Sequence, residues 1–385
     1  MKKFVVAILK SSSWKDYALF KNHPEYSAIL NLIARHKDLD FVLIGTSESA
    51  LASYRMKDNV LAWDIPIPHR LVESLTSQLH LFRILAVARP RIIISAGLMN
   101  VVPALVTSLF YPKCRVAPIF IGEFEYYGTK KTGRLLNCIQ FKTMSIVLRL
   151  LETKMPKIFA LSLWERKGIE KIAPNLKGKI TLISYPISSI FNSIKRKSDQ
   201  ETIPPKVLTV AGIEPRKGLD VLIKAVSLLT IEERPKVIIK GGIRDPFYMQ
   251  QLLRLVEMLS LENWIQFDKS IIDYDALLSY YQEATLFVFP TRADCLGVVV
   301  LEALHSGLPV IATSVGGIPD MIQNGVNGIL IEPDNPQELA NVISRLLKDK
   351  ASRDALARNA ISTLENRYYN RITLENAFEK SVQEL

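Results

Sequence analysis

The stretch LFVFPTRADCLGVVVLEALHSGLPVIAT, residues 286–313, identifies the kind of fold this chain adopts. It opens with an apolar run, LFVF, that ends at Pro290, and it closes with a second run, VIAT, after Pro309. Between them lie a polar loop and a helical segment, VVVLEALHS, which Gly307 ends as a C-terminal glycine. Continuous apolar strands that alternate with helices are typical of a parallel sheet covered on both faces. We therefore expect an α/β protein.

Strand-length apolar runs and helical patterns alternate along the whole chain. In the second half the runs are VLTVA, VII, WIQF, LFVFP, PVIAT and GILI. In the first half they are FVVAIL, FVLIG, VLAWDI, RIIIS, VAPIFI, KIFALS and KITLIS, with helical stretches near residues 26–36, 70–88 and 132–151. A chain of 385 residues suits two domains of roughly 100 to 200 residues each. The sequence predicts two tandem doubly wound, Rossmann-like domains.

The domain boundary is placed at a polar run, NSIKRKSDQETIPPK, that begins at Asn192 and has the composition of a linker. We expect an N-terminal domain over residues 1–195 and a C-terminal domain over residues 205–365. The tail, residues 366–385, has the pattern of one further helix, and no sheet remains for it to join in sequence. We expect this helix to pack back across the domain junction.

Composition is typical of a folded protein in a reducing compartment. Hydrophobic residues make up 48% and charged residues 23%, which excludes the disordered and collagen-like classes. The three cysteines form no CxxC pair, and the apolar run Phe4–Leu9 is shorter than a signal-peptide core. We expect a cytoplasmic protein.

The segment Ile92–Pro112 has 21 residues without a charge, about the length that crosses a bilayer. Gly97, Asn100 and Pro103 interrupt it, and its triple isoleucine is typical of a buried parallel strand. We expect a strand that leads through a loop into a helix, and not a membrane span.

Positive charge is concentrated in the first half of the chain. Residues 1–200 hold 30 Lys and Arg against 14 Asp and Glu, a net +16, whereas residues 201–385 hold 19 against 24, a net −5. Seven basic residues and one acid, Glu152, fall between Thr129 and Lys157. This basic amphipathic pattern can lie on anionic lipid, or it can be an ordinary helix with a solvated face. Aromatic residues do not interleave with the basic ones, so no nucleic-acid partner is expected.

The loop TRADCLG after the LFVF strand is the candidate ligand site, because open α/β sheets bind ligands at strand carboxyl ends. It carries Asp294, and Glu302 follows eight positions later on the next helix. The amides of Gly297, Val298 and Val299 lie at that helix N-terminus, where free N–H groups and the helix dipole attract phosphate. By themselves the two carboxylates could be a helix N-terminal acid and a solvated glutamate. The glycine and a lysine at a separate strand end favour a binding site.

These motifs resemble the signatures of a known enzyme family. DCLGVVVLEALHSGLPVIATSVGGIPDMIQNGVNGILIEPDNPQEL resembles the carboxyl-terminal signature of family four retaining glycosyltransferases, of the glycosyltransferase group 1 type. VAGIEPRKGLDVLIKAVSLL resembles their phosphate-binding lysine segment, and ALSLWERKGI with KITLISYPISSIF resembles the end of their first domain. The resemblance is strong over residues 205–348. It implies the GT-B architecture, in which two Rossmann-like domains face a central cleft.

The resemblance also implies roles for individual residues. Glu302 would bind the ribose hydroxyls of a nucleotide sugar, and Asp294 would contact the transferred sugar. Lys217, with Arg216 beside it, would pair with the diphosphate, and charge-assisted contacts of this kind contribute roughly 1.5 to 3 kcal/mol each. Asp294 and Lys217 are the residues expected to act in catalysis. The donor site would be completed by four residues at the helix start: Leu296, Gly297, Val298 and Val299.

Several positions depart from the family pattern. The family usually has an arginine after the glycine of its first signature, where this chain has Ile213, and Arg216 is the available substitute. Asp294 is one methylene shorter than the usual glutamate, and a misplacement of about 1 Å can lower a rate on the order of a hundredfold. The first domain lacks the family's glycine-rich loop and histidine. It offers Glu123 and Glu125 as acceptor-side residues, or as ordinary surface carboxylates.

The resemblance thus implies a retaining, metal-independent glycosyltransferase that moves a sugar from a nucleoside-diphosphate sugar to a glycan or lipid-linked acceptor. No cofactor is expected, and a UDP-sugar is placed ahead of a GDP-sugar as donor. We expect a role in cell-surface polysaccharide or glycolipid synthesis, in the cytoplasm or peripherally on the inner face of the cell membrane. The alternatives are a nucleotide-sugar epimerase or hydrolase of the same architecture, and a non-catalytic sugar-nucleotide-binding subunit.

Overall fold

The computed structural model describes two compact units, and each is considered by itself. The described residues are 5–9, 24–47, 52–66, 71–96, 98–120, 146, 148–150, 152–187, 191, 204–270 and 274–383. The first unit comprises Met1–Pro186 together with Arg371–Leu385, and the second comprises Ile187–Asn370. The chain therefore leaves the first unit, forms the second, and returns to the first.

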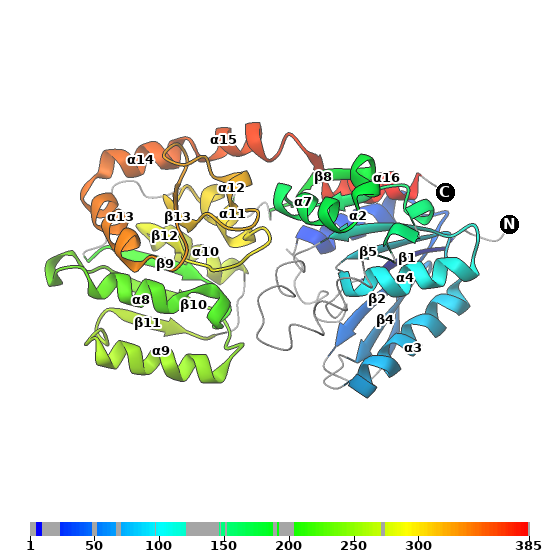
Figure 1. The fold of residues 1–385 in the computed structure, drawn as a ribbon, viewed down its shortest axis with the longest axis horizontal. Helices are drawn as coiled ribbons and strands as arrows, with labels where there is room; N and C mark the ends of the chain where they lie inside the picture. The colour runs from blue at the N-terminus through cyan, green and yellow to red at the C-terminus, as the bar shows by residue number, and fades with distance from the viewer. Residues whose placement is uncertain are drawn as a thin grey trace. The chain divides into compact units, whose positions relative to one another are not determined.

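The first unit is built around a nine-stranded sheet in the order β15-β8-β7-β6-β5-β1-β2-β4-β3 (Figure 1). The strands are β1 (Val5–Leu9), β2 (Asp40–Ser47), β3 (Ala52–Lys57), β4 (Val60–Pro66), β5 (Ile92–Ala96), β6 (Arg115–Phe120), β7 (Ile158–Ala160), β8 (Ile180–Ser184) and β15 (Ile372–Thr373). Every pairing is parallel except that of β3 with β4. The seven strands predicted in the first half are present, and β3 is an additional edge strand.

Helices pack on this sheet and complete its core. The described ones are α2 (Pro24–Arg35), α3 (Leu71–Ala88), α4 (Leu98–Phe110), α7 (Leu163–Ile172) and α16 (Leu374–Val382). Ile93 and Val116 from the sheet are fully buried in one cluster with Leu85 of α3 and Leu105 of α4. The uncharged segment Ile92–Pro112 forms β5 and α4, a strand and a helix as predicted. In the described part of the chain, no helix is long and apolar enough to cross a membrane.

The second unit contains a six-stranded sheet in the order β11-β10-β9-β12-β13-β14, and all its pairings are parallel. The strands are β9 (Lys206–Val210), β10 (Lys236–Lys240), β11 (Ile265–Asp268), β12 (Leu286–Phe289), β13 (Val310–Thr313) and β14 (Ile329–Ile331). These are the six strands predicted from the apolar runs. The order of the strands reverses between β9 and β12, so this pair is the topological switch point, where α/β proteins bind ligands.

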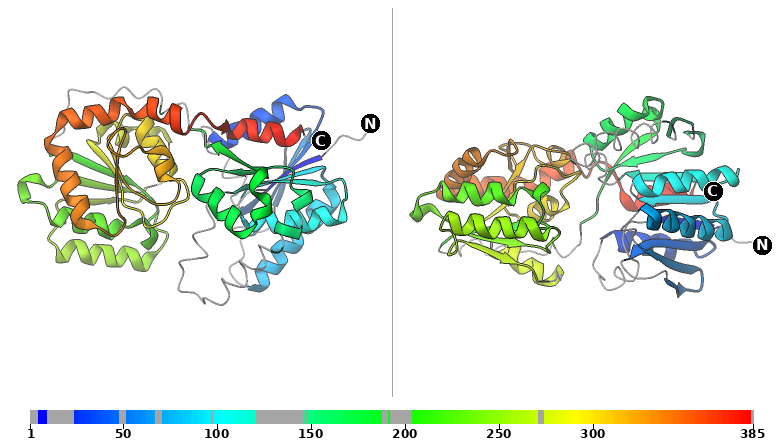
Figure 2. Two further views of the ribbon diagram at one scale, coloured as in Figure 1. Left: turned by 45° about the horizontal axis from the view of Figure 1, so that its top comes forward. Right: turned by 60° about the horizontal axis from the view of Figure 1, so that its bottom comes forward.

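Helices flank the second sheet on both faces (Figure 2). The described ones are α8 (Leu219–Ser227), α9 (Pro246–Met258), α10 (Tyr274–Glu283), α11 (Val298–His305), α12 (Ile318–Met321), α13 (Pro336–Lys348), α14 (Lys350–Arg358) and α15 (Ala360–Arg367). The step from β9 to β10 and the step from β12 to β13 go in opposite directions across the sheet. Right-handed crossovers therefore place α8 and α11 on opposite faces. Both helices follow the strands of the switch point, so their N-termini converge there.

The tail of the chain differs from the single helix expected over residues 366–385. After α15 the chain forms β15, which pairs in parallel with β8, and only then α16. The expectation that no sheet remains for the tail is therefore wrong. α16 packs on α2, where the Glu375 carboxylate lies 2.5 Å from the Arg35 guanidinium. The sequence pattern missed β15 because two residues are too few to show a periodicity.

Candidate functional site

Two loops meet at the switch point of the second sheet. One follows β9 and leads through a 3₁₀ turn, Pro215–Lys217, into α8, and the other joins β12 to α11. They touch at Gly218, which has a φ of 63° and leaves no room for a side chain, because a Cβ there would overlap the Pro290 carbonyl oxygen. The Arg292 N–H also donates to the Arg216 carbonyl at 2.8 Å. These contacts hold the two loops in one arrangement.

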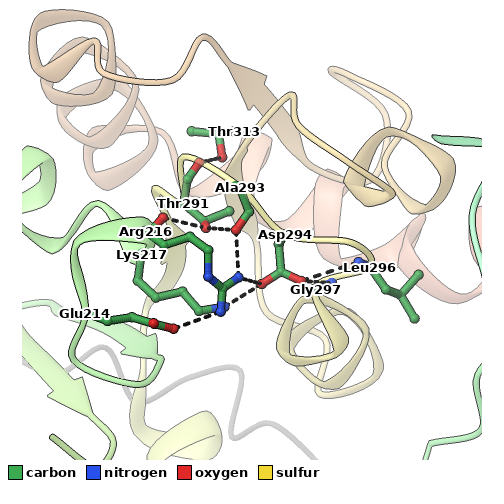
Figure 3. A network of polar contacts seen from close by, with 9 residues as sticks. All are labelled: Glu214, Arg216, Lys217, Thr291, Ala293, Asp294, Leu296, Gly297 and Thr313. Atoms are coloured by element: carbon green, nitrogen blue, oxygen red, sulfur yellow. Dashed lines mark hydrogen bonds and ion pairs between the residues drawn. The ribbon is translucent and has the colours of Figure 1, made fainter. Parts of the chain in front are cut away.

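The carboxylate of Asp294 lies where the loops meet (Figure 3). Its Oδ2 atom accepts a hydrogen bond of 2.5 Å from the Lys217 ammonium and lies 3.6 Å from the Arg216 guanidinium. Its Oδ1 atom accepts from the N–H groups of Gly297 at 2.9 Å and Leu296 at 3.3 Å. The cations and amides expected around a phosphate are thus gathered around one side-chain anion. The arrangement suits negative charge, and in this structure Asp294 supplies that charge.

The two cations differ in how far they are withdrawn from water. The Lys217 side chain is 12% exposed, and its ammonium lies 5.1 Å from the centre of the Phe289 ring, a cation–π distance. The Arg216 side chain is 35% exposed, donates to the Ala293 carbonyl at 2.8 Å and pairs with Glu214 at 2.8 Å. Coulomb attraction is stronger where water is excluded. We therefore expect Lys217 to bind an anion more strongly than Arg216 does.

The start of α11 adds free N–H groups to this site. Gly297 precedes the helix with a φ of 75°, a left-handed conformation that glycine adopts readily. Among the described residues, the N–H groups of Val298 and Val299 have no hydrogen-bond acceptor. Two N–H groups and the positive end of the helix dipole thus remain for a bound anion.

Glu302 lies about one turn into α11 and is buried, with 6% of its surface exposed. The Tyr281 hydroxyl donates a hydrogen bond of 2.8 Å to its Oε2 atom. Burial raises the pKa of the Glu302 carboxyl to about 7, and the bond from Tyr281 offsets only part of that rise. Near neutral pH this carboxyl therefore exchanges between its neutral and ionised forms. Its contact with ribose hydroxyls stays a prediction.

The raised pKa of Glu302 makes stability depend on pH. The folded protein holds the Glu302 proton up to about pH 7, whereas the unfolded chain releases it near the ordinary glutamate pKa of 4.5, so stability falls as pH rises between these values. We expect Glu302→Gln to remove this loss. Relative to the wild type, the variant should gain a few kcal/mol between pH 5 and pH 8, at about 1.4 kcal/mol per pKa unit.

Urea unfolding at both pH values measures this gain, and Glu257→Gln, on the exposed face of α9, is the matched control. Burial lowers the pKa of His305 to about 4, so its contribution rises with pH, but it acts in both proteins and cancels in the difference. An equal difference between Glu302→Gln and the wild type at pH 5 and pH 8 would contradict the buried, protonated state.

The sequence pattern missed Arg292, which stands in the same loop two residues before Asp294. Its guanidinium donates to both carboxylate oxygens of Asp220 on α8, each at 2.8 Å. Burial tends to raise the pKa of Asp220, but the hydrogen bonds from Arg292 and Tyr248 outweigh it and lower the pKa to about 2. This ion pair ties the loop after β12 to α8. An arginine in a strand-end loop was visible in the sequence, but its partner 72 residues away was not.

The structure brings most of the predicted donor-side residues together. Lys217, Arg216 and Asp294 form one network with the backbone of Leu296 and Gly297. Val298 and Val299 adjoin it, and Glu302 lies one turn further along α11. Ile213, which stands where the family usually has an arginine, is buried. The guanidinium of Arg216, the predicted substitute for that arginine, lies 3.6 Å from the Asp294 carboxylate. The acceptor-side residues lie outside the described residues: Glu123 and Glu125.

The basic run is only partly described, since Lys130, Lys131, Arg134 and Lys142 also fall outside. Within the described ranges, no group of three or more His, Cys, Asp or Glu side chains could hold a metal ion.

Comparison with known proteins shows what the second unit is similar to. Residues 191–363 match the family model described as Glycosyl transferases group 1. One relative is the D-inositol 3-phosphate glycosyltransferase of Streptosporangium roseum, which is 30% identical over 166 residues. This alignment covers 40% of the chain and 37% of the relative, so the chain matches less than two fifths of the relative's length.

Solved structures resemble the whole chain. The sucrose-phosphate synthase of Thermosynechococcus elongatus has a TM-score of 0.73 at 17% identity and covers 99% of this chain and 98% of its own. Anabaena HepE, solved in complex with UDP-glucose, has a TM-score of 0.68 at 15% identity, with 98% of each chain covered. At these identities the likeness concerns the fold. The predicted α/β class, with two Rossmann-like units of the GT-B type, is confirmed.

Proposed function

We propose, since residues 191–363 belong to the group 1 glycosyltransferases, that this chain is a glycosyltransferase whose second unit holds a nucleoside-diphosphate sugar. The observation that carries the proposal is the convergence of Lys217, Arg216 and the N–H groups of Leu296 and Gly297, just before α11, on one anion at the switch point. A diphosphate brings negative charge to a place where the protein offers cations and free N–H groups.

The diphosphate would take over the partners that Asp294 holds in the structure. Its oxygens would pair with Lys217 and Arg216 and accept from the free N–H groups of Val298 and Val299. Negative charge grows on the leaving phosphate as its bond to the sugar breaks, so these preorganised groups stabilise the transition state more than the ground state. Asp294, released from Lys217, would then accept hydrogen bonds from hydroxyls of the transferred sugar.

The proposed reaction retains the anomeric configuration and uses no metal ion. The acceptor hydroxyl attacks the anomeric carbon from the face that the diphosphate leaves. As the new C–O bond forms and the C–O bond to phosphate breaks, a leaving phosphate oxygen takes the acceptor proton. The products are the glycosylated acceptor and a nucleoside diphosphate. Lys217 and Arg216 would offset the charge of the diphosphate in the role that a metal ion has in other enzymes.

We take the donor to be a UDP-sugar and the acceptor to be a glycan or a lipid-linked molecule bound by the first unit. The presence of UDP-glucose in the complex of Anabaena HepE supports this choice of donor. The net positive charge of residues 1–200 supports an anionic acceptor or a nearby anionic lipid surface. The proposed setting is cell-surface polysaccharide or glycolipid synthesis on the cytoplasmic side of the membrane.

Calorimetric titration with a set of UDP- and GDP-sugars tests the donor site. We expect at least one of them to bind, and Glu302→Gln to raise its Kd roughly tenfold to a hundredfold, because an ionised acceptor of the ribose hydroxyls is lost. Glu257→Gln again serves as the control. If no nucleotide sugar binds, or if Glu302→Gln binds as the wild type does, the proposed donor site is wrong.

Product analysis then separates the proposed transferase from an epimerase or hydrolase. Sugar that is released or inverted from the donor in the absence of any acceptor would contradict a transferase. Donor binding without turnover against any acceptor would instead favour the non-catalytic subunit.

A further inference from the structure

Helix α4 in the first unit turns apolar residues to its surroundings and buries polar ones. Thr107 and Ser108 are fully buried, and the Ser108 hydroxyl donates to a carbonyl of the same helix at 2.6 Å. Val106, Leu109 and Phe110 are 39%, 54% and 64% exposed. Their spacing of three and four residues places these side chains on one face of the helix. An ordinary surface helix shows the opposite distribution.

Helix α3 extends this exposed face. Leu79 and Val87 are 55% and 86% exposed. The rings of Phe82 and Phe110 meet edge to face with 5.5 Å between their centres, and α3 and α4 lie side by side in Figures 1 and 2. The α3/α4 face is defined by its five exposed apolar residues: Leu79, Val87, Val106, Leu109 and Phe110.

The charged side chains that the structure describes on α3, on α4 and in the segments just after them are all basic. Four exposed basic residues stand on the two helices or just after them: Arg83, Arg89, Lys113 and Arg115. Residues 74–122, which begin just after Glu73 in the first turn of α3 and run through β6, contain no Asp or Glu. Helix α9 of the second unit also exposes large apolar residues, but there Arg254 and Glu257 both stand among them. The α3/α4 face therefore combines exposed apolar area with described charges of one sign, whereas α9 does not.

We propose that the α3/α4 face docks on the surface of an anionic lipid bilayer. Apolar side chains on such a face enter the boundary between headgroups and acyl chains, and basic side chains beside them pair with lipid phosphates. A second copy of this chain fits less well, because two identical faces would bring basic residues against basic residues. The proposal concerns a different surface from the donor site and does not depend on the sugar chemistry.

Sedimentation of the full chain with lipid vesicles tests this surface. We expect binding to vesicles that contain phosphatidylglycerol, weaker binding to vesicles of phosphatidylcholine alone, and weaker binding at high salt. Leu109→Ser with Phe110→Ser should lower the partition coefficient on the order of a hundredfold, since two apolar side chains lose their burial. Arg83→Gln with Lys113→Gln should lower it about twenty-fivefold, at roughly fivefold for each basic residue. The matched control, Phe247→Ser with Met258→Ser on α9, should bind as the wild type does.

Several outcomes would overturn the proposal. These are a wild-type chain that does not bind anionic vesicles at low salt, serine and glutamine variants that bind as well as the wild type, and an α9 control that loses binding equally. A wild-type dimer that Phe110→Ser converts to a monomer, without vesicle binding, would assign the face to a second copy. Every changed side chain is exposed, so we expect all variants to fold, with a slightly lower melting temperature only for the serine variant on α4, which loses the contact between Phe110 and Phe82. If the serine variant fails to fold, the glutamine variant still decides the result.

Discussion

We expect Lys217→Met to lower kcat/KM for sugar transfer roughly a hundredfold to a thousandfold, the usual effect of removing one preorganised charge or donor from an active site. Lys217 is the least exposed cation of the site, so no water readily replaces it beside the leaving phosphate. Methionine keeps an unbranched apolar side chain of similar length over the Phe289 ring, and it therefore removes the charge with little loss of packing. Steady-state kinetics with the donor found by calorimetry measures the effect.

Lys224→Met is the matched control for Lys217→Met. Lys224 stands on α8, seven residues further along, and its side chain is 50% exposed. Removing it should change kcat/KM less than about twofold, because exposed charges are well screened. If the two variants have similar activity, the role proposed for Lys217 is wrong. Lys217→Arg should recover part of the lost rate, since the charge returns on a different geometry.

We expect Gly316→Ala to lower the free energy of unfolding by about 3 kcal/mol or more and to abolish donor binding. Gly316 has a φ of 55°, and a Cβ at this position would overlap the carbonyl oxygen of Asp294. The atoms that the Cβ would meet belong to the backbone of Asp294 and Cys295, so no side-chain rotation relieves the clash. The loop that carries Asp294 must move, and its carboxylate then leaves the place where it meets Lys217 and the N–H groups of Leu296 and Gly297. Urea unfolding and calorimetry measure the two effects.

Two other glycines separate the causes of the Gly316 effect. Gly325 has a φ of 78°, but no atom lies within 4 Å of the place a Cβ would take, so Gly325→Ala tests left-handed strain alone and should cost about 1 kcal/mol. Gly242 has neither a positive φ nor a close neighbour, and Gly242→Ala should be nearly neutral. Should Gly316→Ala cost no more than Gly325→Ala, the close packing of the Asp294 loop would not matter for stability.

The strands of both sheets could be predicted because parallel strands buried on both faces leave continuous apolar runs in the sequence. The edge strand β3, ASYRMK, leaves no such run, since it borders the sheet and alternates polar and apolar residues. The tail was misjudged for a different reason. The pairing of β15 with β8 joins segments far apart in the chain, and local patterns carry no information about such a pairing.

The candidate site could be predicted only as far as the ends of the strands. The sequence motifs identified Lys217, Asp294 and Glu302. The strand order in the structure then showed that Lys217 and Asp294 both lie at the switch point. The sequence could not show that Lys217 and Asp294 pair with each other, because their contact spans 77 residues. Nor could it show that Glu302 is buried against Tyr281, which raises its pKa. The ionisation and pairing of these side chains therefore depend on residues that lie far away in the sequence.

The return of the tail to the first unit constrains how the protein is made. α16 buries Leu374 and Phe378 in that unit, and its Glu379 carboxylate lies 2.7 Å from His36, the residue that follows α2. During synthesis, α2 therefore has no α16 to pack against until the chain is more than 300 residues longer. The second unit, by contrast, has all its strands as soon as residue 331 has left the ribosome. The unit that begins first is completed last, and a chain that stops short of α16 exposes apolar surface of α2 to chaperones and proteases.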